Sequence, residues 1–234
     1  MSREIWILRH GHRRDYEPGW HKHPRFNENF RDPPLSKYGF ELAKKGALEF
    51  VKKSKAVKEK KIKFIYCSPY TRCIQTAIEM IKAVKKEIKY DIKLIIVYNL
   101  GESGWFARYE DFNVKDGKIQ LNKELIDSKM KPDYLKKKYK SYIHKFIGSD
   151  IKDVTYDKEL QTMLKTIISI ENKEKKSFVI VGHLDTIRIA YRYFYNDKKI
   201  PDWVSGGPDH CNIMMGFSEK NNKYKMLYKP NNKF

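Results

Sequence analysis

The 234 residues of this chain are long enough for one large α/β domain, and no break in composition divides them. The longest apolar runs hold four residues, as in 94–97, whereas a membrane span needs about 18 to 20. We therefore expect one globular domain over residues 1–234, with insertions at about 12–35 and 104–157, and no membrane partner.

The net charge and the cysteines indicate which partners and which cellular compartment to expect. The net charge is +20, but the lysines are spread over nearly every segment, as is typical of solvated helix faces, so we expect no specific nucleic-acid partner. Cys67, Cys73 and Cys211 are odd in number and lack the spacing of metal ligands, which disfavours disulfides and a zinc site. This pattern indicates a cytoplasmic protein.

The chain begins with an apolar run over 5–8, which predicts a buried strand that stops at Arg9-His10-Gly11. Residues 12–35 hold four prolines and several aromatic side chains, so they predict an ordered insertion loop. Ser36 is placed to cap a helix that runs to about Lys53.

The next segments repeat this order of strand, loop and helix. Residues 64–67 predict a second strand that breaks at Ser68-Pro69, and an amphipathic helix follows over 71–84. A third strand over 94–97 ends shortly before Gly101-Glu102.

The middle of the chain, residues 104–157, is polar and rich in lysine. It predicts a loop with helices near 122–128 and over 133–147. A more strongly periodic helix is predicted over 157–172, because its leucine, isoleucine and methionine residues recur at helical spacing.

The last segments predict a fourth strand over 178–181, closed by Gly182-His183, and a helix over 184–195. Apolar stretches at 213–217 and 224–228, joined through two asparagines, predict an edge hairpin. Alternating strands and helices indicate a three-layer α/β/α sandwich whose central sheet is mostly parallel. In such sheets, ligands bind beyond the carboxyl ends of the strands.

Four polar motifs follow the predicted strands in order: Arg9-His10-Gly11, Ser68-Pro69-Tyr70-Thr71-Arg72, Gly101-Glu102 and Gly182-His183. This ordered set resembles the histidine phosphatase superfamily, also called the phosphoglycerate mutase-like family. Within that superfamily, the segments 9–13, 32–36 and 68–73 look like the suppressor of T-cell signalling phosphatases and their relatives.

The resemblance implies the three-layer fold and a metal-independent phosphatase without a cofactor. It implies that His10 becomes phosphorylated and that Glu102 supplies the proton. It also implies four ligands of the phosphoryl group: Arg9, Arg13, Arg72 and His183. His12 stands where those relatives usually carry glutamate, so the resemblance assigns it no role.

The chemistry of phosphate esters gives reasons for these residue types. A phosphate monoester dianion repels a nucleophile, and guanidinium groups supply permanent positive charge and matching donors without a metal. Neighbouring guanidinium groups would also lower the pKa of His10 and so keep its attacking nitrogen unprotonated. An acid must protonate the leaving oxygen, for which Glu102 is the first candidate and Asp185 the reserve.

Other site types fit less well. Cys67 and Arg72 resemble the cysteine-based tyrosine phosphatase loop, but four residues separate them instead of five and the segment has no glycine. The pairs His10-x-His12 and His21-x-His23 lack acidic partners at metal-ligand spacing. Two alternatives stay open, a cofactor-dependent phosphoglycerate mutase and a non-catalytic phosphate-binding or scaffold protein.

The sequence says less about the substrate and the oligomeric state than about the site. An aromatic and basic rim is predicted around the site, which favours an aryl or bulky phosphate ester such as a phosphotyrosine-type or other phosphorylated small molecule. Its members are Tyr16, Trp20, His21, His23, Phe26 and Trp105. The sequence leaves a homodimer open.

Overall fold

A computed structural model describes most of the chain: residues 2–22, 32–101, 113–115, 118–120, 132–147, 156–174, 176–195, 201, 204 and 212–229. Several residues singled out from the sequence lie outside this part: Glu102, His23, Phe26, Trp105, Cys211, the helix predicted near 122–128 and the side chain of His21. No helix in the described ranges combines the length and the apolar character that crossing a bilayer requires.

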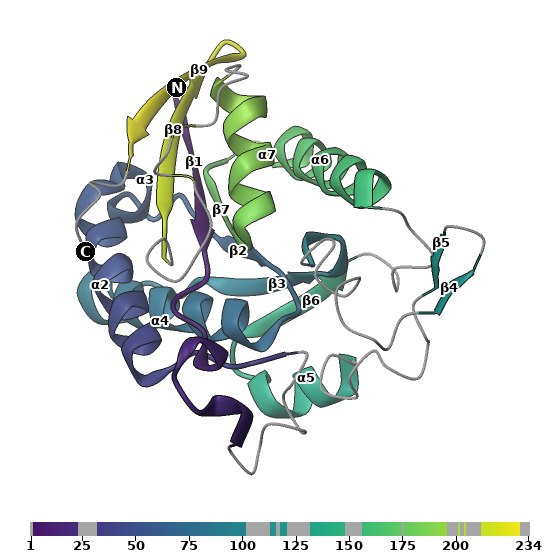
Figure 1. Ribbon diagram of the computed structural model, residues 1–234. Coiled ribbons are helices and arrows are strands. Elements are labelled where there is room, and N and C mark those ends of the chain that lie inside the picture. The colour runs from purple at the N-terminus through teal and green to yellow at the C-terminus, as the bar shows by residue number, and fades with distance from the viewer. Residues whose placement is uncertain are drawn as a thin grey trace.

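Seven strands form one sheet in the order β6-β3-β2-β7-β1-β8-β9 (Figure 1). Their bounds are Arg3–Arg9 (β1), Phe64–Cys67 (β2), Lys93–Val97 (β3), Ile143–Ile147 (β6), Phe178–Gly182 (β7), Met214–Lys220 (β8) and Lys223–Tyr228 (β9). The first five strands of that order run parallel, and the β8–β9 hairpin is antiparallel to β1. The parallel sheet and the predicted edge hairpin are thus confirmed.

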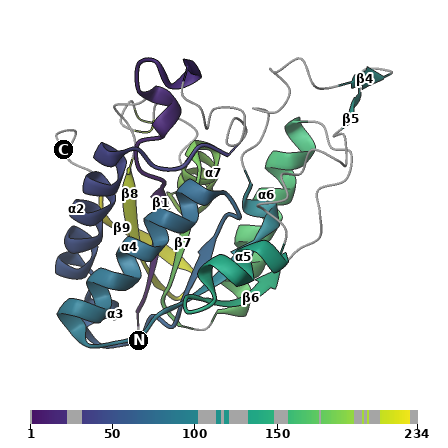
Figure 2. The same cartoon turned by 90° about the horizontal axis from the view of Figure 1, so that it is seen from below.

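Helices cover both faces of the sheet (Figures 1 and 2). One face carries α2 (Lys37–Lys53), α3 (Lys55–Lys58), α4 (Thr71–Ile88) and α5 (Pro132–Tyr139), and the other carries α6 (Tyr156–Lys173) and α7 (Leu184–Tyr195). Alternate side chains of β1 enter different cores, with Trp6 and Leu8 on the α2–α4 side and Ile5 and Ile7 on the α6–α7 side. This arrangement is the predicted three-layer α/β/α sandwich.

The helix predicted over 133–147 is wrong beyond residue 139. Helix α5 ends at Tyr139, and residues 143–147 form β6, which pairs in parallel with β3 at the edge of the sheet. The half-buried edge strand has no clear apolar alternation, so its sequence does not show the pairing that determines its structure. A small hairpin of β4 (Asn113–Lys115) and β5 (Lys118–Gln120), drawn apart from the main sheet in Figure 1, was also not predicted.

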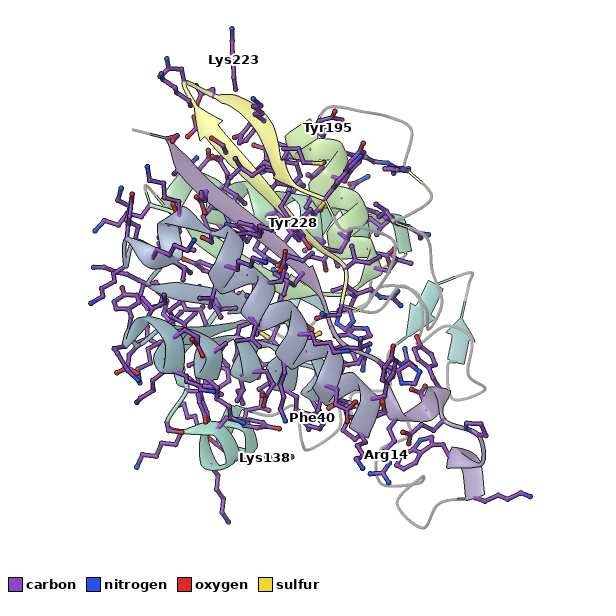
Figure 3. All side chains as sticks on the ribbon, turned by 90° about the vertical axis from the view of Figure 1, so that its left-hand side faces the viewer. Arg14, Phe40, Lys138, Tyr195, Lys223 and Tyr228 are labelled. Carbon is purple, nitrogen blue, oxygen red and sulfur yellow. The ribbon has the colours of Figure 1, made fainter. Side chains whose placement is uncertain are left out.

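The described part of the insertion after β1 contains little regular structure, as predicted. It contains the 3-10 helices η1 (Arg14–Tyr16) and η2 (Trp20–Lys22), and Arg13 forms an isolated antiparallel bridge with Leu35. Figure 2 places this segment at the end of the molecule opposite the N-terminus, and in Figure 3 Arg14 lies far from Lys223 in the β8–β9 hairpin. The insertion therefore stands at the carboxyl ends of the parallel strands, where the site residues are found.

Close backbone packing fixes the loop after β1 against α2. A Cβ atom added at Gly11 would come within 2.6 Å of the Gly39 carbonyl oxygen, and one added at Gly39 would overlap the His12 carbonyl. The Ser36 backbone N–H also donates to the His12 carbonyl oxygen at 3.0 Å. The two residues that follow His10 are consequently held against the start of α2.

Candidate active site

The predicted residues meet because their strands are neighbours. The His10 backbone N–H donates to the Gly182 carbonyl at 3.0 Å, and the Ser68 N–H donates to Val181 at 3.0 Å, which extends the ladders of β7 with β1 and β2 past their ends. The imidazole rings of His10 and His183 lie edge to face with centroids 5.4 Å apart. Both rings are almost fully buried. The carboxyl ends of β1, β2 and β7 therefore converge on one point, as the sequence predicted.

The hydrogen bond of His10 defines which of its nitrogens is available. Nδ1 lies 2.7 Å from the carbonyl oxygen of Gly11. A carbonyl oxygen only accepts, so Nδ1 carries the proton and donates it. In the neutral ring, Nε2 then holds a lone pair and no proton. This tautomer presents Nε2 as a nucleophile.

The electrostatic surroundings keep His10 neutral. Burial lowers the pKa of His10 well below the ordinary value of 6.5, and the positive charges of Arg72 and Arg9, with a contribution from His183, lower it further. The Gly11 hydrogen bond raises this pKa but is outweighed. His10 is thus unprotonated at neutral pH, which a nitrogen nucleophile requires.

His183 is held between Arg72 and Ser68. The Nη2 atom of Arg72 lies 3.5 Å from Nδ1 of His183 and can only donate, so Nδ1 accepts. The proton of neutral His183 therefore sits on Nε2, which lies 2.9 Å from Ser68 Oγ. In this arrangement His183 donates to Ser68 and does not act as its base, so the pair is not the activated nucleophile of a serine hydrolase.

Arg72 is the most enclosed cation of the site, and its side chain is only 1% exposed. Its guanidinium carbon lies 4.3 Å from the centroid of the Tyr70 ring, in a cation–π contact. Its backbone is fixed as well, because Thr76 Oγ donates to the Arg72 carbonyl at 2.8 Å and accepts from Gly11 N–H at 3.0 Å. Thr76 thus ties α4 to the loop that carries His10.

Arg9 and Arg13 complete the positive surroundings, and both are buried. Burial lowers the pKa of His183, and the charges of Arg72, Arg13 and Arg9 add to this effect, so both arginines act on the same pocket. Arg13 is anchored by Asp15, which accepts from Nε at 2.9 Å and also from Nη2, and its guanidinium carbon lies 4.9 Å from the Tyr16 ring centroid. Three guanidinium groups and two imidazoles therefore share one buried site.

Two buried residues of the site were not assigned a role from the sequence. Asp32 accepts hydrogen bonds from Thr71 and lies 3.5 Å from the Nη1 atom of Arg72, and Ser68 accepts from His183. Both belong to motifs that the sequence does display, the Asp-Pro-Pro-Leu-Ser and Ser-Pro segments. Membership of these motifs is the sequence signal from which a role of Asp32 and Ser68 in the site could have been predicted.

Of the two candidate proton donors, only the reserve candidate lies among the described residues. Glu102 lies outside them; the chain before it is described as far as the buried Gly101, which follows the 3-10 helix η3 (Tyr98–Leu100). Asp185, the reserve candidate, lies in the first turn of α7, and its Oδ1 atom is 3.8 Å from Nη1 of Arg188. His12 donates or accepts at Ser36 Oγ, 2.9 Å away, and its ring contacts Tyr16 and Tyr38 edge to face, so it supports the loop.

Two observations concern the cysteines and the histidine, cysteine and carboxylate side chains of the described residues. Burial raises the pKa of the Cys67 thiol well above its usual range, and the neighbouring Cys73 raises it further, which opposes formation of a thiolate nucleophile. Within the described ranges, no three histidine, cysteine, aspartate or glutamate side chains gather as metal ligands would.

The N-terminal part of the chain matches a known protein family. Residues 5–96, which include His10, Asp32 and Arg72, match the model of the Histidine phosphatase superfamily (branch 1). An uncharacterized phosphoglycerate mutase family protein of Acanthamoeba polyphaga mimivirus is 36% identical over 98 residues. That match covers 42% of this chain and 43% of the viral protein, so it spans less than half of the relative.

Solved structures share the fold over nearly the whole chain. The ecdysone phosphate phosphatase EPPase of Bombix mori, solved with tungstate, has a TM-score of 0.60 at 15% identity and covers 98% of this chain and 94% of its own. A putative alpha-ribazole-5'-P phosphatase from Escherichia coli has a TM-score of 0.52 at 11% identity, with 98% of each chain covered. At these identities the likeness establishes the fold.

The protein thus has the α/β fold of solved phosphatases, with a histidine and arginine site at the carboxyl edge of its parallel sheet. The family match covers residues 5–96 of this chain, and the similarity to the solved structures extends over nearly all of it.

The lowered pKa values predict how stability depends on pH. Unfolded histidine takes up a proton below about pH 6.5, whereas buried His10 and His183 do not, so the unfolded state gains protons relative to the folded state as pH falls. The free energy of unfolding should drop between about pH 7 and pH 5, with each group adding up to about 1.4 kcal/mol per pH unit. Urea denaturation of wild type and His10→Asn measures this slope, which should be shallower in the variant. Equal slopes would contradict the lowered pKa of His10.

Proposed function

We propose that this protein hydrolyses phosphate monoesters through a phosphohistidine at His10, without a metal ion. The observation that carries the proposal is the hydrogen bond from His10 Nδ1 to Gly11, which leaves Nε2 unprotonated among buried guanidinium groups. Arg9, Arg13, Arg72 and His183 are the proposed ligands of the phosphoryl group.

In the first step, the Nε2 lone pair of His10 attacks phosphorus, a P–N bond forms, and the bond from phosphorus to the ester oxygen breaks. The leaving oxygen takes a proton from an acid, for which we propose Glu102. The arginines stabilise the charge on the phosphoryl oxygens as this happens. Their buried, fixed positions mean that little reorganisation is needed when charge develops.

In the second step, water attacks phosphorus and the P–N bond breaks, which returns its electron pair to Nε2. The carboxylate of Glu102 takes the proton from that water and is ready to act as acid again. Inorganic phosphate then leaves. One acid serves both half-reactions, and His183 donates to a phosphoryl oxygen if its ring rotates so that Nε2–H points from Ser68 to the substrate.

Replacing His10 tests the nucleophile. The side-chain amide of His10→Asn can keep a donor near Gly11 while removing Nε2, so the fold should persist and hydrolysis of p-nitrophenyl phosphate should fall by about 10³-fold or more. Activity of the wild type should be unchanged in excess chelator. Chelator-sensitive turnover, or turnover in the variant equal to wild type, would refute the proposal. Interconversion of phosphoglycerates with added bisphosphoglycerate would identify a mutase instead.

The substrate is proposed to be an aryl or bulky phosphate ester. Tyr16 stands beside Arg13 and His12 at the described edge of the site, and the similar structure from Bombix mori is named for a bulky ester, ecdysone phosphate. The motifs at 9–13, 32–36 and 68–73 further favour relatives of the suppressor of T-cell signalling phosphatases, and with them phosphotyrosine-type esters. Trp20 is only 6% exposed, and its ring packs against the guanidinium group of Arg14, so it is a buried part of the proposed rim.

The kinetics of two esters test this substrate class. Phosphotyrosine should have a kcat/KM at least roughly tenfold above that of glycerol 2-phosphate, with part of the difference in KM, because a ring contributes apolar burial. Tyr16→Ala should raise KM for phosphotyrosine more than for the small ester. If phosphotyrosine turns over no faster than the alkyl phosphate, the proposed class is wrong.

A further inference from the structure

A buried carboxylate joins the insertion to the start of α4. Asp32 is 2% exposed, and both of its oxygens accept from the Thr71 backbone N–H, at 2.9 Å and 3.1 Å. Thr71 Oγ donates to Oδ2 at 2.5 Å, and Arg72 Nη1 lies 3.5 Å from Oδ1. One side chain thus contacts two successive residues across a separation of about forty positions in sequence.

This contact occupies the N-terminus of the helix. Tyr70, the residue before the first turn of α4, makes no capping hydrogen bond with its own side chain. Asp32 supplies the missing acceptor, and its negative charge lies where the helix dipole favours an anion. The first amide of α4 is therefore engaged by Asp32 and is not available to a phosphate in this arrangement.

The same carboxylate limits where Arg72 can point. The guanidinium group lies against the Tyr70 ring on its face, against His183 through Nη2, and against Asp32 through Nη1. Arg9 and Arg13 place further positive charge in this pocket, as their effect on the pKa of His183 shows. Cations in a buried site repel one another, and a carboxylate on one side of Arg72 offsets that repulsion in a fixed direction.

We infer that Asp32 is a positioning residue: its carboxylate holds the Arg72 guanidinium in the orientation that binds the phosphoryl group. The inference rests on the proposed function and extends it, because Asp32 itself touches no substrate. It also couples the insertion, to which Asp32 belongs, to the phosphate pocket.

Two simpler roles of Asp32 predict different results. If Asp32 only ties the insertion to α4 through its hydrogen bonds with Thr71, its loss lowers stability, and loss of the Thr71 hydroxyl lowers activity as much as loss of Asp32 does. If Asp32 only neutralises charge, its removal makes the pocket more positive and tightens phosphate binding. A positioning role instead weakens phosphate binding, although positive charge has been gained.

The experiment compares Asp32→Asn, Thr71→Val, Arg72→Gln and the Asp32→Asn/Arg72→Gln double variant. Asp32→Asn keeps an acceptor for Thr71 but loses the charge that faces Arg72. It should lower kcat/KM for p-nitrophenyl phosphate by about 10- to 100-fold and raise the inhibition constant of inorganic phosphate. Thr71→Val keeps the carboxylate beside Arg72 and should stay within about threefold of wild type. The double variant should be no worse than Arg72→Gln, because Asp32 acts through Arg72.

Three results would overturn the inference: tighter phosphate binding by Asp32→Asn, an equal loss of activity in Thr71→Val, or losses that multiply in the double variant. Thermal unfolding of each variant separates these effects from loss of the fold. A failure of the proposed function is distinguishable, because it would appear as an inactive wild type. Binding of inorganic phosphate, followed by calorimetry, would then still report whether Asp32 orients Arg72.

Discussion

Burial of positive charge is the constraint on which this site depends. Arg9, Arg13 and Arg72 are withdrawn from water around two neutral imidazoles, a costly arrangement unless each guanidinium is held and compensated. Asp15 binds Arg13 and Asp32 lies beside Arg72, and the Tyr16 and Tyr70 rings lie against the same two arginines. The same burial lowers the pKa values of His10 and His183. The positive field that would bind a phosphate dianion thus also keeps His10, the proposed nucleophile, unprotonated.

The parallel sheet makes this concentration of charge possible. Each parallel strand ends at the same edge, so residues that follow β1, β2 and β7 are brought within contact although they are distant in sequence. Backbone hydrogen bonds from His10 to Gly182 and from Ser68 to Val181 continue the sheet to the site itself. The two helices nearest His10 are locked to its loop through Thr76 of α4 and Gly39 of α2. The geometry is therefore set by rigid elements.

The sequence predicted most of this framework, because the central strands are apolar runs and the main helices are strongly periodic. Strand β2 and helix α7 have the predicted bounds, and Asn221 and Asn222 form the hairpin turn with positive φ values of 55° and 60°. Strand β6 was missed because its half-exposed edge position leaves little apolar pattern. Its structure depends on pairing with β3, which is a tertiary interaction.

In the site, too, some features could be predicted from the sequence and others could not. Adjacent strand ends could be inferred from topology, so the meeting of His10, Arg72 and His183 was foreseeable. The partners of these residues were not, because a hydrogen bond such as that from Thr71 to Asp32 depends on the path of the intervening backbone. The tautomer of His10 likewise follows from the direction of the Gly11 carbonyl, which no residue pattern encodes.

The most direct test of the proposed mechanism is to trap its covalent phosphohistidine intermediate. Wild-type protein in turnover with an aryl phosphate is quenched in alkaline denaturant, which preserves a P–N bond, and the phosphorylated residue is located by peptide mass spectrometry. A phosphohistidine mechanism predicts a phosphoryl group on His10 that is absent from His10→Asn. A phosphoryl group on any other side chain during turnover would contradict it.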